Sequence, residues 1–408
     1  MNFLKQDISQ DKSKGANRGE LVSLMEPLSI SADSRFRDSL NDLAVELAAK
    51  SAGFCQSVPK KLIPALAALV RGMNCYYSNL IEGHDTHPVD IERALNNDYS
   101  KNTHKRNLQL EAGAHIKVQA WIDEGGLADQ AATSFGLLEI HRRFCSFLPE
   151  DLLWVKDTEN KTRIRITPGT LRESDVKVGR HIPVSPGVIP MFLERFESAY
   201  AGPGRLETII SAAAAHHRLL WIHPFLDGNG RVARLMSHAM LLKPLHTGGI
   251  WSVARGLARN EQQYKELLTN CDQPRRNDLD GRGNLSEEAL VEFTRFFLKT
   301  CLDQVAFMAS LMQPDQLKER IISWVQREIQ QSNLPHKSAR LLEAVLYSGG
   351  SLPRGDAAKI LDVGSRQARR IVAGVMESGA LVSESSRAPL YLNFPAHLAG
   401  EWLPGLFP

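Results

Sequence analysis

The sequence has few cysteines, and they form no pattern. Its 408 residues include five cysteines, scattered singly along the chain with no C-x-x-C pair. This spacing argues against a disulfide framework and against a zinc–cysteine module, and a reducing cytoplasm is the simplest location. The five are Cys55, Cys75, Cys145, Cys271 and Cys301.

Long hydrophobic runs are also absent. The first 20 residues lack the apolar core of a signal peptide. No stretch approaches the roughly 20 uncharged apolar residues that a membrane span requires. We therefore expect a cytoplasmic protein that is not exported and has no membrane partner.

Neither sign of charge is in large excess. Lysine and arginine total 49, aspartate and glutamate total 46, and the formal net charge is only +3. This balance excludes a broadly basic nucleic-acid coat protein, and 43% hydrophobic with 23% charged residues excludes a disordered chain. A length of 408 residues predicts two or three folded domains.

Helical periodicity dominates what is present. Residues 33–119 place Leu and Ala at three- and four-residue spacings, and the Ala-rich residues 206–222 are typical of the central helix of a bundle. Residues 176–184 (VKVGRHIPV) contain alternating β-branched residues, which predict a short hairpin. The predicted fold class is therefore mainly α, a helical bundle with a short β-hairpin.

Four parts are predicted along the chain. Residues 1–30 are polar and are expected to form an arm, either mobile or wrapped over the body. A helical region (31–130) and a helical core (131–312) follow. In residues 315–408, three short helices precede two β-like runs, the order of a winged helix-turn-helix domain.

The last of these parts carries a small basic cluster. Its third helix begins with SRQARR (residues 365–370), which offers Arg366, Arg369 and Arg370 to DNA phosphates or base edges. Winged helices also dock proteins, so DNA binding and protein docking both stay open.

The segment HPFLDGNGRVAR (residues 223–234) lies between two predicted helices and combines several groups suited to phosphate chemistry. Gly228 and Gly230 flank Asn229 just before a helix, so backbone N–H groups there can form an anion-binding nest. Arg231 and Arg234 lie three residues apart on the new helix, where they can hold different phosphates of one polyphosphate.

Two further residues of this segment suit catalysis. Asp227 supplies a hard oxygen ligand of the kind that Mg²⁺ bound to nucleotide phosphates requires. His223 is the nearby group expected to titrate near neutral pH, which makes it the natural general base. Together with the nest and the arginines, they predict nucleotidyl or phosphoryl transfer to a hydroxyl group.

The same segment resembles the signature of the Fic family, H-P-F-x-[D/E]-G-N-G-R-x-x-R, at every defined position. The resemblance extends from about residue 74 to 298. It implies a mostly helical enzyme that transfers AMP from ATP to a Ser, Thr or Tyr hydroxyl of a target protein. A lysine replaces the second glycine in a related branch that transfers phosphate, so Gly230 favours AMP transfer.

The resemblance also implies a role for each motif residue. His223 would deprotonate the target hydroxyl, Asp227 would hold Mg²⁺, and Phe225 would point into the core. The α and β phosphates of ATP would be bound by Gly228, Asn229, Gly230 and Arg231, and the γ phosphate by Arg234.

Two other segments gain roles from this resemblance. The hairpin would act as a flap that pairs with the target backbone by strand addition. Its residues are Val178, Gly179, Arg180, His181, Ile182 and Pro183. Asn260 and Tyr264 would contribute to the adenine pocket, although Tyr264 also suits the core.

Residues 78–83 (SNLIEG) match the Fic inhibitory pattern [S/T]-x-x-x-E-[G/N]. Glu82 is expected to end a helix, where the helix dipole disfavours a carboxylate, so it should pair with a cation. The resemblance implies that Arg234 is this cation, so that the Glu82–Arg234 pair inhibits the enzyme. Ser78 is the first residue of the pattern. Because this pattern precedes the motif at 223–234, the chain resembles the class with an N-terminal inhibitory helix.

Several alternatives stay open. The chain could be a DNA-binding regulator whose Fic core senses a nucleotide, or a Fic transferase with another donor such as UTP. Glu82 could also support removal of AMP from the target. A homodimer is a further option, because relatives often dimerise. A zinc site at His216, His217 and His223 is not expected, since neighbouring helix residues diverge and no carboxylate completes the set.

Overall fold

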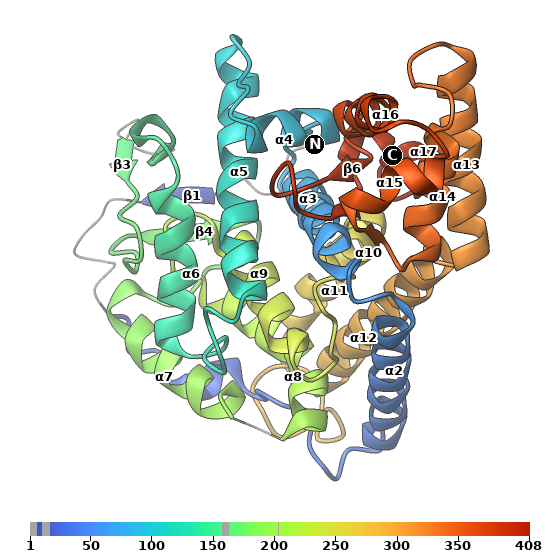
Figure 1. The fold of residues 1–408 in the computed structure, drawn as a ribbon. Coiled ribbons are helices and arrows are strands. Elements are labelled where there is room, and N and C mark those ends of the chain that lie inside the picture. Colours follow the sequence, from blue (N-terminus) through green and yellow to red (C-terminus); the bar gives the residue numbers. More distant parts are fainter. Residues whose placement is uncertain (1–5, 10–16, 157–162, 203) are drawn as a thin grey trace.

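The computed structural model describes residues 6–9, 17–156, 163–202 and 204–408, with the backbone only for 6–9. The chain is mainly helical, as predicted (Figure 1). Its helices are α2 (Arg37–Ser57), α3 (Ile63–Ile81), α4 (Pro88–Leu95), α5 (Thr103–Asp123), α6 (Ser134–Ser146), α7 (Ile189–Tyr200), α8 (Arg205–Ile222), α9 (Asn229–Leu242), α10 (Ala254–Arg259), α11 (Glu261–Cys271), α12 (Glu287–Leu311), α13 (Pro314–Gln330), α14 (Ser338–Tyr347), α15 (Ala357–Leu361), α16 (Ser365–Glu377) and α17 (Ala396–Trp402).

The described strands are short and antiparallel. They pair as β1 with β4, as β2 with β3, and in the order β5-β7-β6. The β2–β3 pair was not predicted. The strands are β1 (Gln6–Ser9), β2 (Trp154–Lys156), β3 (Arg163–Arg165), β4 (Asp175–Val178), β5 (Ser351–Leu352), β6 (Leu381–Val382) and β7 (Leu390–Leu392).

Helix α8 is the central helix of the bundle, as its composition predicted. It packs against α2, α7, α9 and α12. The alanines at 212–215 are all buried, so every face of this stretch contacts protein. Their small side chains let neighbouring helices approach closely, and they leave the larger side chains of those helices to fill the core.

The N-terminal segment wraps over the bundle in the part that is described. The carbonyl of Pro27 accepts hydrogen bonds from Arg218 Nε (3.1 Å) and Nη2 (2.8 Å), and the carbonyl of Leu28 accepts one from Tyr200 Oη. Arg218 is fully buried. The mobile alternative for the arm is therefore wrong for residues 17–30, and residues 1–5 and 10–16 of the predicted arm lie outside the described residues.

The predicted hairpin is present as a tight turn. Val178 and His181 exchange two backbone hydrogen bonds of 3.0 Å across Gly179, whose φ of 61° favours glycine. Beyond this single bridge, the return arm does not form a strand in the described residues. The partner along the length of β4 is instead β1, from the N-terminal part of the chain.

The C-terminal elements run in the order α14, β5, α15, α16, β6, β7, and the winged helix-turn-helix stays a prediction for this part of the chain. Helix α16 buries Ala368, Ile371, Val372 and Val375 at three- and four-residue spacings. The end of the chain then returns to α3, where Tyr77 Oη donates to the carbonyl of Leu406 (3.1 Å). Among the described residues, we find no helix with the length and apolar character needed to cross a membrane.

Several histidines lie inside the helical bundle, and their environment makes stability depend on pH. Burial lowers the pKa of His115, His216 and His223 to about 3 and that of His141 to about 4. In the unfolded chain a histidine has a pKa of about 6.5. Below that pH the unfolded chain binds protons that the folded chain does not, so stability falls as pH decreases.

We therefore predict that the free energy of unfolding decreases between pH 7.5 and pH 5.5. Each neutral buried histidine contributes a decrease of about 1.4 kcal/mol at pH 5.5. His115→Gln should make the dependence shallower by about that amount, and replacement of the exposed His336 by Gln should not change it. Urea unfolding at both pH values measures this, and equal wild-type stability would contradict it.

Candidate functional site

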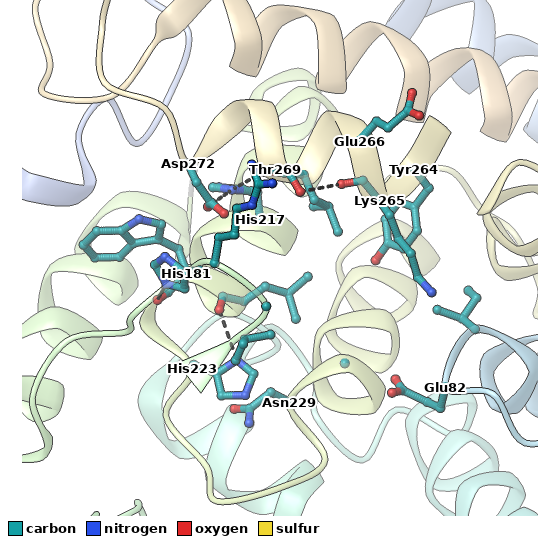
Figure 2. A pocket seen from close by; sticks show the side chains of 18 of the residues that line it. Glu82, His181, His217, His223, Asn229, Tyr264, Lys265, Glu266, Thr269 and Asp272 are labelled. Atoms are coloured by element: carbon teal, nitrogen blue, oxygen red, sulfur yellow. Dashed lines mark hydrogen bonds and ion pairs between the residues drawn. The ribbon is translucent and has the colours of Figure 1, made fainter. Parts of the chain in front are cut away.

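A cavity of about 1300 Å³ lies where the end of α3, the loop between α8 and α9, the turn after β4 and helix α11 meet (Figure 2). Of the predicted site residues, which the structure describes in full, Ser78, Pro183 and Asn260 do not line it. Those that line it are Glu82, Val178, Gly179, Arg180, His181, Ile182, His223, Asp227, Gly228, Asn229, Gly230, Arg231, Arg234 and Tyr264.

The loop between α8 and α9 is braced by the side chain of Asn229. This amide accepts a hydrogen bond from Phe225 N (2.9 Å) and donates one to Phe225 O (2.8 Å). The Phe225 ring is fully buried, as predicted, and stacks on His141 with 4.0 Å between ring centroids. Because the brace uses the side-chain oxygen and one side-chain N–H of Asn229, its backbone N–H is the group best placed to meet a phosphate at the helix start.

The first turn of α9 contacts a carboxylate of the protein itself. Gly228 has a φ of 82°, which favours glycine, and its N–H donates to Asp227 Oδ1 (2.7 Å). A Cβ on Gly230 would lie only 2.3 Å from Glu82 Oε1, so the approach of Glu82 requires glycine here. The helix start predicted to bind phosphate therefore holds Glu82 against it.

Glu82 and Arg234 form the predicted ion pair. Arg234 donates through Nη2 to Glu82 Oε1 and through Nε to Ser78 Oγ (2.8 Å). Burial raises the pKa of the Glu82 carboxyl, but Arg234 and Arg231 outweigh burial and hold this pKa below its usual value. Glu82 is therefore ionised, and it reaches the cavity from the C-terminal end of α3 (Figure 2).

Arg231 has an ionic partner that sequence reasoning missed. Its Nη2 donates to Glu111 Oε2 (2.8 Å), and the same oxygen lies 3.1 Å from His84 Nδ1. The guanidinium also lies over the ring of Phe144, 5.2 Å from its centroid. Glu111 sits on α5 outside the cavity lining, so no local motif could have identified it.

His223 is held as a neutral imidazole. Its Nδ1 lies 3.2 Å from the carbonyl of Leu220, which can only accept, so Nδ1 carries the proton and the basic lone pair is on Nε2. Burial, with help from Arg172, lowers its pKa to about 3. The expectation that His223 titrates near neutral pH is therefore wrong, because the side chain is buried; its neutral form is nevertheless the one that accepts a proton.

Arg172 joins the flap to the loop between α8 and α9 and was not identified from the sequence. Its Nε donates to the carbonyl of His223 (2.7 Å), and its other nitrogens donate to the carbonyls of Ser174 (2.9 Å) and Val184. The guanidinium is almost fully buried, which lowers its pKa to about 10. A buried arginine that satisfies three carbonyls fixes these segments relative to each other.

The turn of the flap is attached to α8. His181 Nε2 donates to the carbonyl of Trp221 (2.7 Å), and the carbonyl of Pro183 accepts from Arg18 Nη2 (2.9 Å). The side chain of Ile182 is exposed. Residues 178–182 of the predicted target-binding turn line the same cavity as His223.

The two predicted adenine-site residues differ. Asn260 is exposed, and its amide donates to the carbonyl of Gly256 (2.9 Å), so the structure places it outside the cavity. Tyr264 lines the cavity while its hydroxyl donates to His216 Nε2 (2.7 Å). His216 Nδ1 in turn donates to Ser237 Oγ (2.9 Å), whose own proton goes to a backbone carbonyl. Tyr264 thus serves both the core and the cavity wall.

The histidines are not arranged for zinc. Tyr264 and Ser237 use both ring nitrogens of His216, and His217 Nε2 pairs with Asp272 Oδ1 (2.9 Å). Within the described residues, no three His, Cys, Asp or Glu side chains gather in a way that could hold a metal ion.

Comparison with known proteins identifies the segment that carries this site. Residues 133–241 match the Fic/DOC family profile. "Protein adenylyltransferase Fic" of Drosophila willistoni is 34% identical over 111 residues, and its namesake in Drosophila melanogaster is 34% identical over 109. Each match covers 26% of this chain and 19% of the relative, so the chain spans only about a fifth of the length of these curated proteins.

Solved structures also resemble the chain. A Fic family protein from Desulfovibrio desulfuricans has a TM-score of 0.49 and 16% identity, covering 86% of this chain and 96% of its own. A structure of Fic-1 from C. elegans has a TM-score of 0.48 and 18% identity, covering 68% of this chain and 74% of its own. The family profile, the curated relatives and the complete motif at 223–234 show that residues 133–241 form a Fic domain.

Proposed function

We propose that this chain is a protein adenylyltransferase, which transfers AMP from ATP to a Ser, Thr or Tyr hydroxyl of a target protein and is restrained by Glu82. The proposal rests on the motif at 223–234. Its histidine, aspartate and two arginines line the same cavity as Glu82; they are His223, Asp227, Arg231 and Arg234. The names of the curated relatives support the same activity over this part of the chain.

The reaction follows from the position and protonation of His223. The target hydroxyl oxygen attacks the α phosphorus of ATP, and the bond from that phosphorus to the pyrophosphate oxygen breaks. The hydroxyl proton moves to Nε2 of His223, and pyrophosphate leaves. A neutral imidazole with its proton on Nδ1 is ready for this step.

The phosphates of ATP are expected at the start of α9. Backbone N–H groups and the helix dipole favour anions there, and Arg231 and Arg234 both line the cavity. Glu82 now contacts that helix start and pairs with Arg234. A triphosphate and Glu82 therefore compete for the same charges, which is the basis of the proposed autoinhibition.

Asp227 fits a magnesium ion that accompanies ATP. Mg²⁺ is usually held by one or two carboxylates together with the substrate phosphates, and Asp227 lines the cavity beside the phosphate site. Burial raises the pKa of Asp227, a penalty on its charged form that a cation relieves. The ion would supply positive charge to the phosphates.

We predict that His223→Ala reduces AMP transfer by about a thousandfold or more, because no other group would take the proton of the target hydroxyl. Replacement of the exposed His336 by Ala is the matched control and should leave the rate unchanged. The assay is self-modification with ATP and Mg²⁺, read by mass spectrometry. An AMP adduct on the protein identifies ATP as donor, whereas modification only with UTP would contradict this proposal.

Glu82→Gly should raise self-modification at least tenfold, because loss of a buried ion pair worth about 1.4 kcal/mol already gives that factor. Glu124→Gly is a close control: Glu124 also ends a helix before a glycine of positive φ, Gly125, but it is exposed and lies away from the cavity. Equal rates for wild type and Glu82→Gly would refute the restraint.

A second candidate function, DNA binding, is supported by the exposed face of α16. Arg366, Arg369 and Arg370 are all exposed on the side opposite the buried stripe of this helix. Among the described residues, these three arginines form no ion pair. Unpaired guanidinium groups at i, i+3 and i+4 form a continuous basic face that can follow DNA phosphates.

For this candidate we predict that full-length protein binds duplex DNA and that Arg369→Ala/Arg370→Ala weakens the binding. Loss of two phosphate contacts should reduce the slope of log affinity against log salt by about 2. Arg275→Ala/Arg276→Ala removes the same charge from the exposed loop before α12 and should have no effect. Mobility shifts at several salt concentrations measure this, and equal weakening by both variants would refute a specific role for α16.

A further inference from the structure

The N-terminal strand β1 lies along the flap strand β4 (Figure 1). The pairing is antiparallel, with Gln6 opposite Val178 and Ser9 opposite Asp175. Val178 also bridges to His181 across the turn of the flap. A strand has two edges, and the return arm of the flap takes one edge of β4 through His181. β1 therefore occupies the other edge, which we call the outer edge of β4.

The chain is anchored beside this pairing by Arg18 and Glu20. Arg18 Nη1 forms an ion pair with Asp175 (2.8 Å), the residue at the start of β4, and its Nη2 donates to the carbonyl of Pro183 (2.9 Å). Glu20 accepts hydrogen bonds from Ser185 N (2.9 Å) and Ser185 Oγ (2.6 Å). The segment that follows β1 is thus fixed to both arms of the flap.

This anchor keeps β1 close to its edge. Only eight residues separate Ser9 from Arg18 in the sequence. So short a separation gives an effective concentration of the order of millimolar. A target segment that pairs with the same edge must therefore compete with β1 at this effective concentration.

We infer that residues 6–9 are a resident occupant of the target-docking edge of β4, which an extended segment of a target must displace. The inference rests on the proposed function, because it assumes that targets dock by strand addition to the flap. Residues 6–9 would thus restrain binding of the target at the flap, which we call the target side of the site. Glu82 would instead restrain binding of ATP at the start of α9, the nucleotide side.

Residues 6–8 offer no hydroxyl group that could accept AMP. Residues 1–8 (MNFLKQDI) contain no Ser, Thr or Tyr. Gln6 is the residue opposite Val178, which lines the cavity, whereas Ser9 is opposite Asp175, which does not line it. The strand therefore offers a backbone that can pair with the flap but no hydroxyl group at the end nearest the cavity.

Hydrogen exchange tests the occupancy without any need for catalysis. Deletion of residues 2–10 should speed amide exchange at Asp175 and Lys177 at least about tenfold, since alternate N–H groups of β4 face the outer edge, which loses its partner. The N–H of Val178 already donates to the carbonyl of His181 and should not respond. Arg18→Ala should give an intermediate effect. Arg35→Ala, which removes another exposed N-terminal ion pair, is the matched control and should have none. Unchanged exchange after the deletion would overturn the inference.

A peptide substrate tests the competition itself, in the Glu82→Gly background. The probes are synthetic peptides of residues 1–10 with Gln6→Ser or Asp7→Ser; adjacent strand residues point to opposite faces, so one of the two should present its hydroxyl to the cavity. The deleted protein should label that peptide with AMP at least about tenfold faster than the full chain. The same peptide with Ile8→Pro should be labelled more slowly.

The outcomes separate the two proposals. Equal labelling of the peptide by the deleted and full-length proteins would overturn the inference while leaving adenylyltransferase activity intact. Absence of any AMP transfer by either protein would refute the proposed function, and the exchange measurement would still decide whether β1 occupies the flap.

Discussion

The ion pair between Glu82 and Arg234 is the interaction on which the cavity depends. A lone carboxylate in this position would be driven toward its protonated form by burial, and a lone buried guanidinium would be costly. In the pair, Arg234 keeps the Glu82 carboxylate ionised, and Glu82 balances the charge of the buried guanidinium. The start of α9 adds its own partial positive charge. Because Glu82 caps α3, its position is set by the packing of that whole helix against α5 and α10.

The near-neutral total charge is consistent with this arrangement. Arg231 and Arg234 are concentrated on one helical turn, and each is matched by a carboxylate from outside the motif, Glu111 and Glu82. The two carboxylates are not equivalent, since Glu82 lines the cavity and Glu111 does not. Under the proposed function, an incoming triphosphate would therefore meet Glu82 first, whereas Glu111 could stay in place and keep the Arg231 guanidinium oriented.

Site residues could be predicted from the sequence where their partners lie nearby in the chain, and not where the partners are distant. The groups of residues 223–234 share one loop and one helix start, so their spacing predicted a phosphate site, and the helix end at Glu82 predicted a need for a cation. Arg172 and Glu111 could not be found this way, because their partners are distant in sequence and neither lies in a motif. The pKa of His223 was missed for a related reason: burial follows from packing, which spacing does not reveal.

The two sides of the site are held by contacts of different strength. A four-residue strand at an edge has few backbone hydrogen bonds and opens readily, so under the proposed function occupancy of the flap would vary with the concentration of a competing segment. Release of Glu82 instead requires movement at the end of α3, a helix embedded in the bundle. That helix is also bonded to the C-terminal end of the chain through Tyr77 and Leu406. A partner bound at the C-terminal elements is therefore better placed to influence the nucleotide side than the target side.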